Sequence, residues 1–184
     1  FTPCLSLERL KLLMDDMDLK VEDRPVVNPA REYAEKKMAE NERYKNVVVL
    51  ALELPDGSII TGRSSRRMVA SAAAILNAVK QMSGLADDIH LLSPTLLESI
   101  QKLKTDVLQA EKTSLNCEEV LTALTISAAT NPVSEAALGK LGCLRGCKAH
   151  CTAILSDKDE KTLKSLGIDV TSDPEYVTNN LYFS

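Results

Sequence analysis

The 184-residue sequence has few aromatic residues: no Trp, four Tyr and two Phe, or 3% of the chain. Because 45% of the residues are nonetheless hydrophobic, the core must consist of aliphatic side chains, and the chain is long enough to bury one. No apolar run reaches the roughly 18 residues of a membrane-spanning helix, so no membrane crossing is expected. The formal net charge of −4 disfavours binding to nucleic acid or to an anionic membrane surface.

Histidine is equally scarce, and His90 and His150 are the only two. The sequence shows no Ser-His-Asp set, no Gly-rich phosphate-binding loop and no paired carboxylates in a plausible cleft. The sequence therefore identifies no catalytic residue and leaves open whether the protein is an enzyme, and we predict no cofactor. His90 lies alone in an expected strand, which favours a structural role.

The five cysteines are an odd number, which favours reduced thiols and a cytoplasmic location. Cys143, Cys147 and Cys151 lie close in sequence, and His150 precedes the last of them. Thiolate and imidazole are ligands of zinc, so a zinc or redox site is one interpretation. The C-x3-C-x3-C spacing lacks a C-x2-C knuckle, however, and free Cys packs as a small hydrophobe. We favour the structural role and predict no metal site.

Capping signals define most of the predicted helices. Three pairs place a capping side chain directly before a proline: Asn28-Pro29, Ser93-Pro94 and Asn131-Pro132. Two further pairs resemble capping boxes: Asn116 with Glu119, and Asp157 with Glu160. With the spacing of apolar residues, these signals predict helices at 5–18, 29–44, 64–83, 94–110, 117–130, 132–142 and 157–166.

Strands are predicted at 47–54, 58–61, 88–92, 148–155 and 168–172. The turn Pro55-Asp56-Gly57 joins the first two as a hairpin. The alternation of strands with helices predicts an α/β domain of three layers with a mixed five-stranded sheet. In this interpretation residues 1–45 form a helical lead-in, residues 46–184 form the α/β domain, and residues at about 111–146 form a helical insertion.

Four segments, in order along the chain, resemble one bacterial family. They are Ala51–Gly57, Asp87–Pro94, Gln101–Thr105 and Ile126–Pro132. They are similar to the C-terminal portion of the family known as domain of unknown function 1846, and the resemblance runs from about Pro29 to Pro174. It implies a further N-terminal portion, which in the family carries a Gly-rich stretch resembling a phosphate-binding loop. It implies no particular activity.

The order of elements also resembles the cytidine-deaminase layout. A hairpin at 47–62 is followed by a helix of small residues, a strand and Ser93-Pro94. Deaminases place a His or Cys with a Glu on that helix and Pro-Cys-x-x-Cys at the next. Here Ala70–Ala73 and Thr95–Glu98 occupy these positions. The resemblance therefore implies a cytidine-deaminase-like fold without the zinc ligands.

A ligand site is predicted where strands end and helices begin. Ligands of open α/β sheets bind outside the carboxyl ends of strands, and helix N-termini offer unpaired N–H groups to anions. The predicted anion-binding residues are Arg63, Ser64, Ser65, Arg67, Ser93 and Thr95. They would hold a phosphate-bearing small molecule. The alternative is that the hydroxyl residues only cap helices and the arginines are solvated.

These observations favour a non-catalytic module for ligand binding or self-association, acting as a homo-oligomer within a longer cytoplasmic protein. The alternative is an enzyme acting on a nucleotide or phosphorylated substrate, whose composite active site this domain completes with the N-terminal portion. Tyr33 and Tyr44 fall in the lead-in, and Tyr176 and Tyr182 near the tail. We therefore expect no aromatic ring beside the crevice to stack on a nucleobase.

Overall fold

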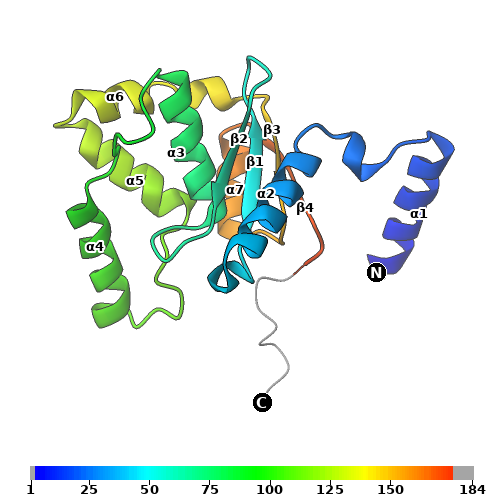
Figure 1. Cartoon of the computed structure of the whole chain (residues 1–184), viewed down its shortest axis with the longest axis horizontal. Helices are drawn as coiled ribbons and strands as arrows, with labels where there is room; N and C mark the ends of the chain where they lie inside the picture. The colour runs from blue at the N-terminus through cyan, green and yellow to red at the C-terminus, as the bar shows by residue number, and fades with distance from the viewer. Residues whose placement is uncertain (1–2, 176–184) are drawn as a thin grey trace.

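A computed structural model describes residues 3–175 as a four-stranded mixed sheet with helices on both faces (Figure 1). The strands are β1 (Val49–Glu53), β2 (Ile59–Arg63), β3 (Lys148–Cys151) and β4 (Asp169–Ser172), in the order β2-β1-β3-β4. Strand β1 is antiparallel to β2 and β3, whereas β3 and β4 are parallel. The carboxyl ends of β2, β3 and β4 therefore lie on the same side of the sheet, beside the start of β1. We call this side the carboxyl edge of the sheet.

The described residues also form seven α-helices and four shorter helical turns. The helices are α1 (Pro3–Asp16), α2 (Val27–Glu40), α3 (Ala70–Met82), α4 (Pro94–Lys102), α5 (Cys117–Ala128), α6 (Pro132–Leu138) and α7 (Asp157–Ser165). The turns are η1 (Val21–Asp23), η2 (Glu42–Tyr44), η3 (Leu103–Val107) and η4 (Leu141–Leu144). Figure 1 shows α1 standing apart from the other elements.

Strand β1 is apolar and buried from Val49 to Leu52, because helices cover both of its faces. Leu50 and Leu52 belong to the main core, which α3, α5 and α7 also supply. Val49 and Ala51 point the other way and pack against α2. A strand buried on both faces has no polar alternation. Helix α2, which comes from the predicted lead-in, thus forms one layer, and α3, α5 and α7 lie in the opposite layer.

The α/β class and the mixed sheet are confirmed, but the predicted fifth strand at 88–92 is wrong. This segment is a loop between α3 and α4, and it pairs with no strand in the described part of the chain. Leu91 and Leu92 are both buried, at 4% and 5% exposure, whereas neighbouring residues of a strand point to opposite faces. The five-stranded cytidine-deaminase-like fold is therefore not confirmed.

Three of the predicted caps are confirmed. The side chains of Ser93, Asn131 and Asn116 accept hydrogen bonds from backbone N–H groups at the starts of α4, α6 and α5. Two are wrong by one or two residues. Asn28 lies inside the first turn of α2, and Ser156 rather than Asp157 caps α7. The N-cap position of α2 is Val26, which makes no side-chain capping bond, and a shift of one or two residues is within the usual uncertainty of helix ends.

Helix α3 lies unusually close to β2 because Gly62 faces it. A Cβ atom on Gly62 would come within 2.1 Å of the backbone nitrogen of Ala74. Ala70, Ala74 and Ala78 are all buried along the same face of α3. This contact between small residues explains the alanine-rich sequence of the helix, and it fixes the first turn of α3 above the carboxyl end of β2.

Candidate functional site

A cavity of about 290 Å³ opens at the edge of the sheet where β2 and β3 end, and we call it the edge cavity. This volume is close to the lower end of the roughly 300–1,000 Å³ range of small-molecule pockets. Its apolar lining consists of Val48, Met68, Val69, Ala70, Ile154 and Leu155. Its other lining residues are Ser64, Ser65, Ser71, Lys112, Ser114, Cys151, Ser156 and Asp159.

The start of α3 forms one wall of the edge cavity and lacks a capping side chain. Its N-cap residue is Val69, whose own N–H donates to the carbonyl of Leu115 at 3.0 Å. Ser71 is 1% exposed, and its Oγ makes no hydrogen bond to a nitrogen or oxygen atom within residues 3–175. It interacts with the buried thiol of Cys117, and a thiol is only a weak hydrogen-bond partner. A stronger partner would recover free energy at this buried hydroxyl, so this wall offers a polar contact to a ligand.

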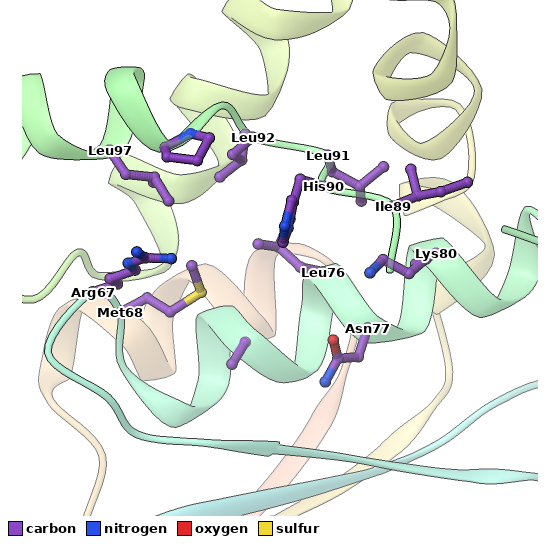
Figure 2. A pocket seen from close by; sticks show the side chains of 12 residues that line it. Arg67, Met68, Leu76, Asn77, Lys80, Ile89, His90, Leu91, Leu92 and Leu97 are labelled. Atoms are coloured by element: carbon purple, nitrogen blue, oxygen red, sulfur yellow. The ribbon is translucent and has the colours of Figure 1, made fainter. Parts of the chain in front are cut away.

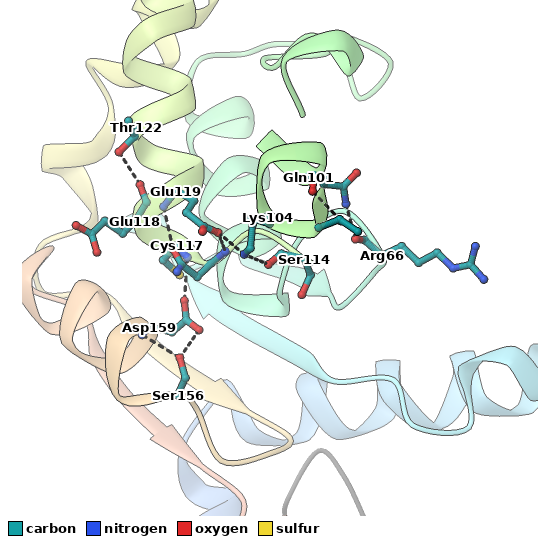
Figure 3. Close-up of polar contacts among 12 residues, drawn as sticks. Arg66, Gln101, Lys104, Ser114, Cys117, Glu118, Glu119, Thr122, Ser156 and Asp159 are labelled. Atoms are coloured by element: carbon teal, nitrogen blue, oxygen red, sulfur yellow. Dashed lines mark hydrogen bonds and ion pairs between the residues drawn. The ribbon is translucent and has the colours of Figure 1, made fainter. Parts of the chain in front are cut away.

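Asp159 joins the starts of two helices at the bottom of the same cavity (Figure 3). It is 4% exposed. Its Oδ1 accepts a hydrogen bond from the N–H of Cys117 at 2.8 Å, and its Oδ2 accepts one from the Ser156 hydroxyl at 2.6 Å. A carboxylate is stabilised by the positive ends of the helices that it contacts. The acidic side chain is thus held in place by α5 and α7.

The two cysteines near the edge cavity are not activated nucleophiles. Burial raises the pKa of the Cys117 thiol far above its ordinary range, the Asp159 carboxylate adds to this effect, and the nearby Ser71 hydroxyl opposes it. Burial likewise raises the pKa of Cys151 to about 11. Because the thiolate is the reactive form, both side chains are inert at neutral pH.

A second depression, of about 860 Å³, shares Ser64 and Ser65 with the edge cavity. We call it the basic groove. Its lining residues are Glu42, Tyr44, Lys45, Asn46, Val47, Arg63, Ser64, Ser65 and Arg66. The guanidinium of Arg63 lies 4.9 Å from the centre of the Tyr44 ring. The prediction that no aromatic ring lies beside the crevice is therefore wrong, because η2, which contains Tyr44, lies next to the end of β2.

Ser64 and Ser65 shape the loop between β2 and α3 and do not cap α3. The Oγ of Ser64 accepts a hydrogen bond from the N–H of Val48 at 3.0 Å. The Oγ of Ser65 accepts from the N–H groups of Arg67 and Met68, both at 3.2 Å. These bonds hold the loop in a non-helical conformation, so α3 begins at Ala70 and not at the predicted residue 64.

The structure divides the six predicted anion-binding residues. Arg63, Ser64 and Ser65 lie together in the basic groove. Arg67 lines a third cavity, of about 170 Å³, between α3 and the start of α4 (Figure 2). Ser93 caps α4 by accepting from the N–H of Leu96 at 3.1 Å, and Thr95 is exposed in the first turn of that helix. Neither of them lines any of these three cavities.

Cys143, Cys147, Cys151 and His150 do not gather around one point. Cys143 is exposed, whereas Cys147 and Cys151 pack in the main core. His150 follows Ala149 in β3 and faces the α2 side of the sheet, because neighbouring strand residues point to opposite faces. Within residues 3–175 no group of three His, Cys, Asp or Glu side chains is arranged to hold a metal ion.

His150 instead belongs to a polar network that fastens α2 to the end of β4. Its Nδ1 lies 2.9 Å from Thr171 Oγ1, and its Nε2 lies 3.3 Å from Asp173 Oδ1 without hydrogen-bond geometry. Arg31 donates two hydrogen bonds to Asp173, at 2.7 and 3.1 Å. Burial lowers the pKa of His150, against the opposing effect of Asp173. The Arg31 hydrogen bonds lower the pKa of Asp173.

Several residues that the fold brings to these cavities were not predicted, and His90 and Tyr44 are the clearest examples. His90, expected in a strand with a structural role, is exposed on a loop and lines the cavity that also contains Arg67. Tyr44 lines the basic groove. In the sequence both residues lie near the end of a predicted helix or strand. This position does not indicate which cavity the residue lines, because that depends on the path of the loop in the folded chain.

In the part of the chain that the structure describes, no helix is both long and apolar enough to cross a membrane.

Comparison with known proteins places the chain among bacterial sequences. The profile of the family described as "Domain of unknown function DUF1846, C-terminal" matches residues 22–182. A UPF0371 protein of Clostridium botulinum strain Langeland is 53% identical over 179 residues. A UPF0371 protein of Clostridioides difficile strain 630 is 50% identical over 179 residues. Each match covers 97% of this chain and 36% of the relative, so the chain spans about a third of these relatives' length. The chain therefore belongs to the family of C-terminal DUF1846 domains.

Proposed function

We propose that this domain binds a phosphate-bearing small molecule with an apolar body at the carboxyl edge of its sheet. The phosphate would lie in the basic groove, and the apolar body would enter the edge cavity. One observation carries the proposal: the groove and the cavity meet at Ser64 and Ser65. A basic surface and an apolar pocket that share two residues suit a ligand with both characters.

The charges in the groove support an anionic ligand. Three cations, Lys45, Arg63 and Arg66, line it together with one carboxylate, Glu42, in a chain whose net charge is −4. Arg63 stacks on Tyr44, but the Lys45 and Arg66 side chains make no ion pair with any residue that the structure describes. Lysine and arginine without protein partners are available to phosphate oxygens.

The edge cavity supports an apolar body that carries one polar atom. Most of its exposed surface is apolar, and the Ser71 hydroxyl in its wall has the weakly hydrogen-bonding Cys117 thiol beside it and no nitrogen or oxygen partner among the described residues. The pKa values of Cys117 and Cys151 give no reactive thiolate, and the start of α3 carries Ala70, Ala72 and Ala73. These features favour binding over catalysis by this domain alone.

Isothermal titration calorimetry with inorganic phosphate and phenyl phosphate tests the proposal. We expect phenyl phosphate to bind at least tenfold more tightly, because burying its ring adds roughly 1.5–3 kcal/mol. Arg66→Gln should weaken both ligands, and Ser71→Ala should leave inorganic phosphate unaffected. Lys148→Gln, which removes an exposed charge at the opposite end of β3, is the control. Equal affinities for the two ligands, or no effect of Arg66→Gln, would contradict the proposal.

The second candidate function is a composite active site for a nucleotide or phosphorylated substrate. It is favoured by the chain's coverage of only 36% of its relatives, together with the open form of the basic groove, which a further domain could cover. An activity assay on a full-length relative distinguishes the two candidates. If the relative hydrolyses a phosphate ester, and the variant that corresponds to Arg66→Gln does not, the composite active site is favoured.

A further inference from the structure

The third cavity, here called the α3–α4 cavity, lies between α3 and residues 89–97. Its volume is about 170 Å³. Figure 2 shows the side chains of Arg67, Lys80 and His90 directed toward it from three different segments. These segments are the bend before α3, the last turn of α3, and the loop before α4.

The α3–α4 cavity is lined by nitrogen-bearing side chains and by no carboxylate. The guanidinium of Arg67 and the ring of His90 have no hydrogen bond or ion pair with the residues that the structure describes. Lys80 Nζ donates one hydrogen bond to the Asp87 carbonyl at 2.9 Å, which leaves two of its three protons free. In an acidic chain, this concentration of unpaired donors favours a negatively charged ligand.

The remaining walls of the cavity are aliphatic. Leu91, Leu92 and Leu97 are at most 5% exposed, so they form a packed floor, and Leu76 and Ile89 complete the lining. A hydrated inorganic oxyanion gains nothing from such walls, because burial next to them removes its water. A carboxylate that carries a short aliphatic chain can pair with the nitrogen-bearing side chains and pack its chain on the aliphatic walls.

We propose that the α3–α4 cavity binds a small aliphatic carboxylic acid, at a site separate from the phosphate site. The Arg67 guanidinium pairs with the carboxylate, since its planar fork matches two carboxylate oxygens. Lys80 and His90 add donors, and the aliphatic body lies on Leu76 and the leucines opposite. The volume is below the roughly 300 Å³ at which pockets for drug-sized molecules begin, so the acid is compact.

Two neighbouring arginines separate this site from the first one. Arg66 lines the basic groove and Arg67 lines the α3–α4 cavity. Neither residue lines the other's depression. Arg67→Gln and Arg66→Gln remove the same charge from adjacent positions, and each is the matched control for the other. The failure of one proposal is therefore distinguishable from the failure of the other.

The test is calorimetric titration of the intact chain with acetate, butanoate, 4-methylpentanoate and octanoate at constant ionic strength. Affinity should rise about fourfold for each buried methylene, and it should fall for octanoate, which exceeds the cavity. Arg67→Gln should lower the affinity for 4-methylpentanoate at least tenfold, and Arg66→Gln should not change it. Leu76→Ala should shift the optimum toward longer acids, which mere loss of structure does not do.

Three results would overturn this proposal. They are affinity independent of chain length, undiminished binding in Arg67→Gln, and inorganic phosphate binding more tightly than every acid in an Arg67-dependent manner. Circular dichroism checks that each variant is folded. Should Arg67→Gln not fold, Lys80→Gln takes its place, with the same tenfold loss expected and the same interpretation of unchanged binding.

Discussion

At the scale of single residues, Gly62 decides how closely α3 approaches the sheet. Its missing side chain leaves room for the backbone of Ala74, which a Cβ atom would approach to 2.1 Å. Backbone atoms in the middle of a helix cannot rotate out of the way as the end of a side chain can. The position of the first turn of α3, and with it the edge cavity, depends on this contact.

Gly62→Ala should therefore destabilise the domain. We expect the free energy of unfolding to fall by about 1–3 kcal/mol, the usual cost of overpacking, measured by urea denaturation. Gly142→Ala is the control, because a Cβ atom there meets nothing within 4 Å, and its effect should stay within about 0.5 kcal/mol. Equal effects of the two substitutions would show that α3 can move away from β2 without cost.

His150 provides a second prediction at this scale. Burial lowers its pKa, so below about pH 6.5 the unfolded chain binds a proton at this residue that the folded chain does not. Stability should therefore fall as the pH drops below about 6.5, until the folded-state pKa is passed. The pH dependence of the urea midpoint should become flatter in His150→Gln. Parallel pH profiles for the two proteins would be the contrary result.

At the scale of elements, α4 and η3 are fastened to α5 by one ion pair. Lys104 Nζ donates to Glu119 Oε2 and to the Ser114 carbonyl, both at 2.8 Å (Figure 3). Glu119 Oε2 also accepts from the N–H of Asn116 at 2.9 Å, which completes the capping box of α5. The Lys104 side chain is 11% exposed, so Glu119 replaces much of the water that would otherwise solvate its ammonium group.

Glu119→Gln should cost about 1–3 kcal/mol, because it leaves the buried Lys104 ammonium without its carboxylate. The double variant Lys104→Met/Glu119→Gln should recover most of that loss, since it removes the unpaired charge. Urea denaturation of both single variants and the double variant measures the coupling. Additive losses would mean that Lys104 and Glu119 act independently.

Local signals predicted the elements well, and long-range packing accounts for most of the differences. Ser93, Asn116 and Asn131 cap helices because each cap depends on residues two or three positions away. The segment at 88–92 has strand-like residues, but a strand needs a partner, and Leu91 and Leu92 instead both enter the core. Helix α3 begins later than its periodicity suggests because Ser64 bonds to Val48, far away in sequence.

The candidate site was predictable only in part. Arg63, Ser64 and Ser65 follow a strand directly, so local order was enough to place them together. Arg67 and His90 belong to two segments that come together only when α3 packs on the sheet. No residue spacing in the sequence predicts that contact.

At the scale of the whole molecule, α1 is the element with the most exposed apolar surface. Its side chains Leu10, Leu12 and Leu13, and Met17 just after its end, are each more than half exposed, and Figure 1 shows the helix apart from the sheet and its covering layers. Apolar surface of this kind favours a protein partner. A second copy of the chain and the remaining part of a full-length relative are the two candidates.

Self-association through α1 predicts a dimer in sedimentation velocity experiments at micromolar concentration. The double variant Leu12→Glu/Leu13→Glu should sediment as a monomer with unchanged unfolding, because these side chains are not buried in the domain. Leu108→Glu, another exposed apolar position, is the control and should leave the dimer intact. A monomeric wild-type chain would instead favour packing of α1 on the rest of a full-length relative.

The bend between β2 and α3 carries the two arginines of the two proposed sites in consecutive positions. The bend is fixed on one side by Ser65 and on the other by the hydrogen bonds of Arg67 and Val69 with Leu115. Because the bend is held on both sides, a ligand bound to Arg66 leaves the backbone of Arg67 in place. The two binding equilibria should therefore be independent, and saturating the chain with the phosphate compound should leave its affinity for the acid unchanged.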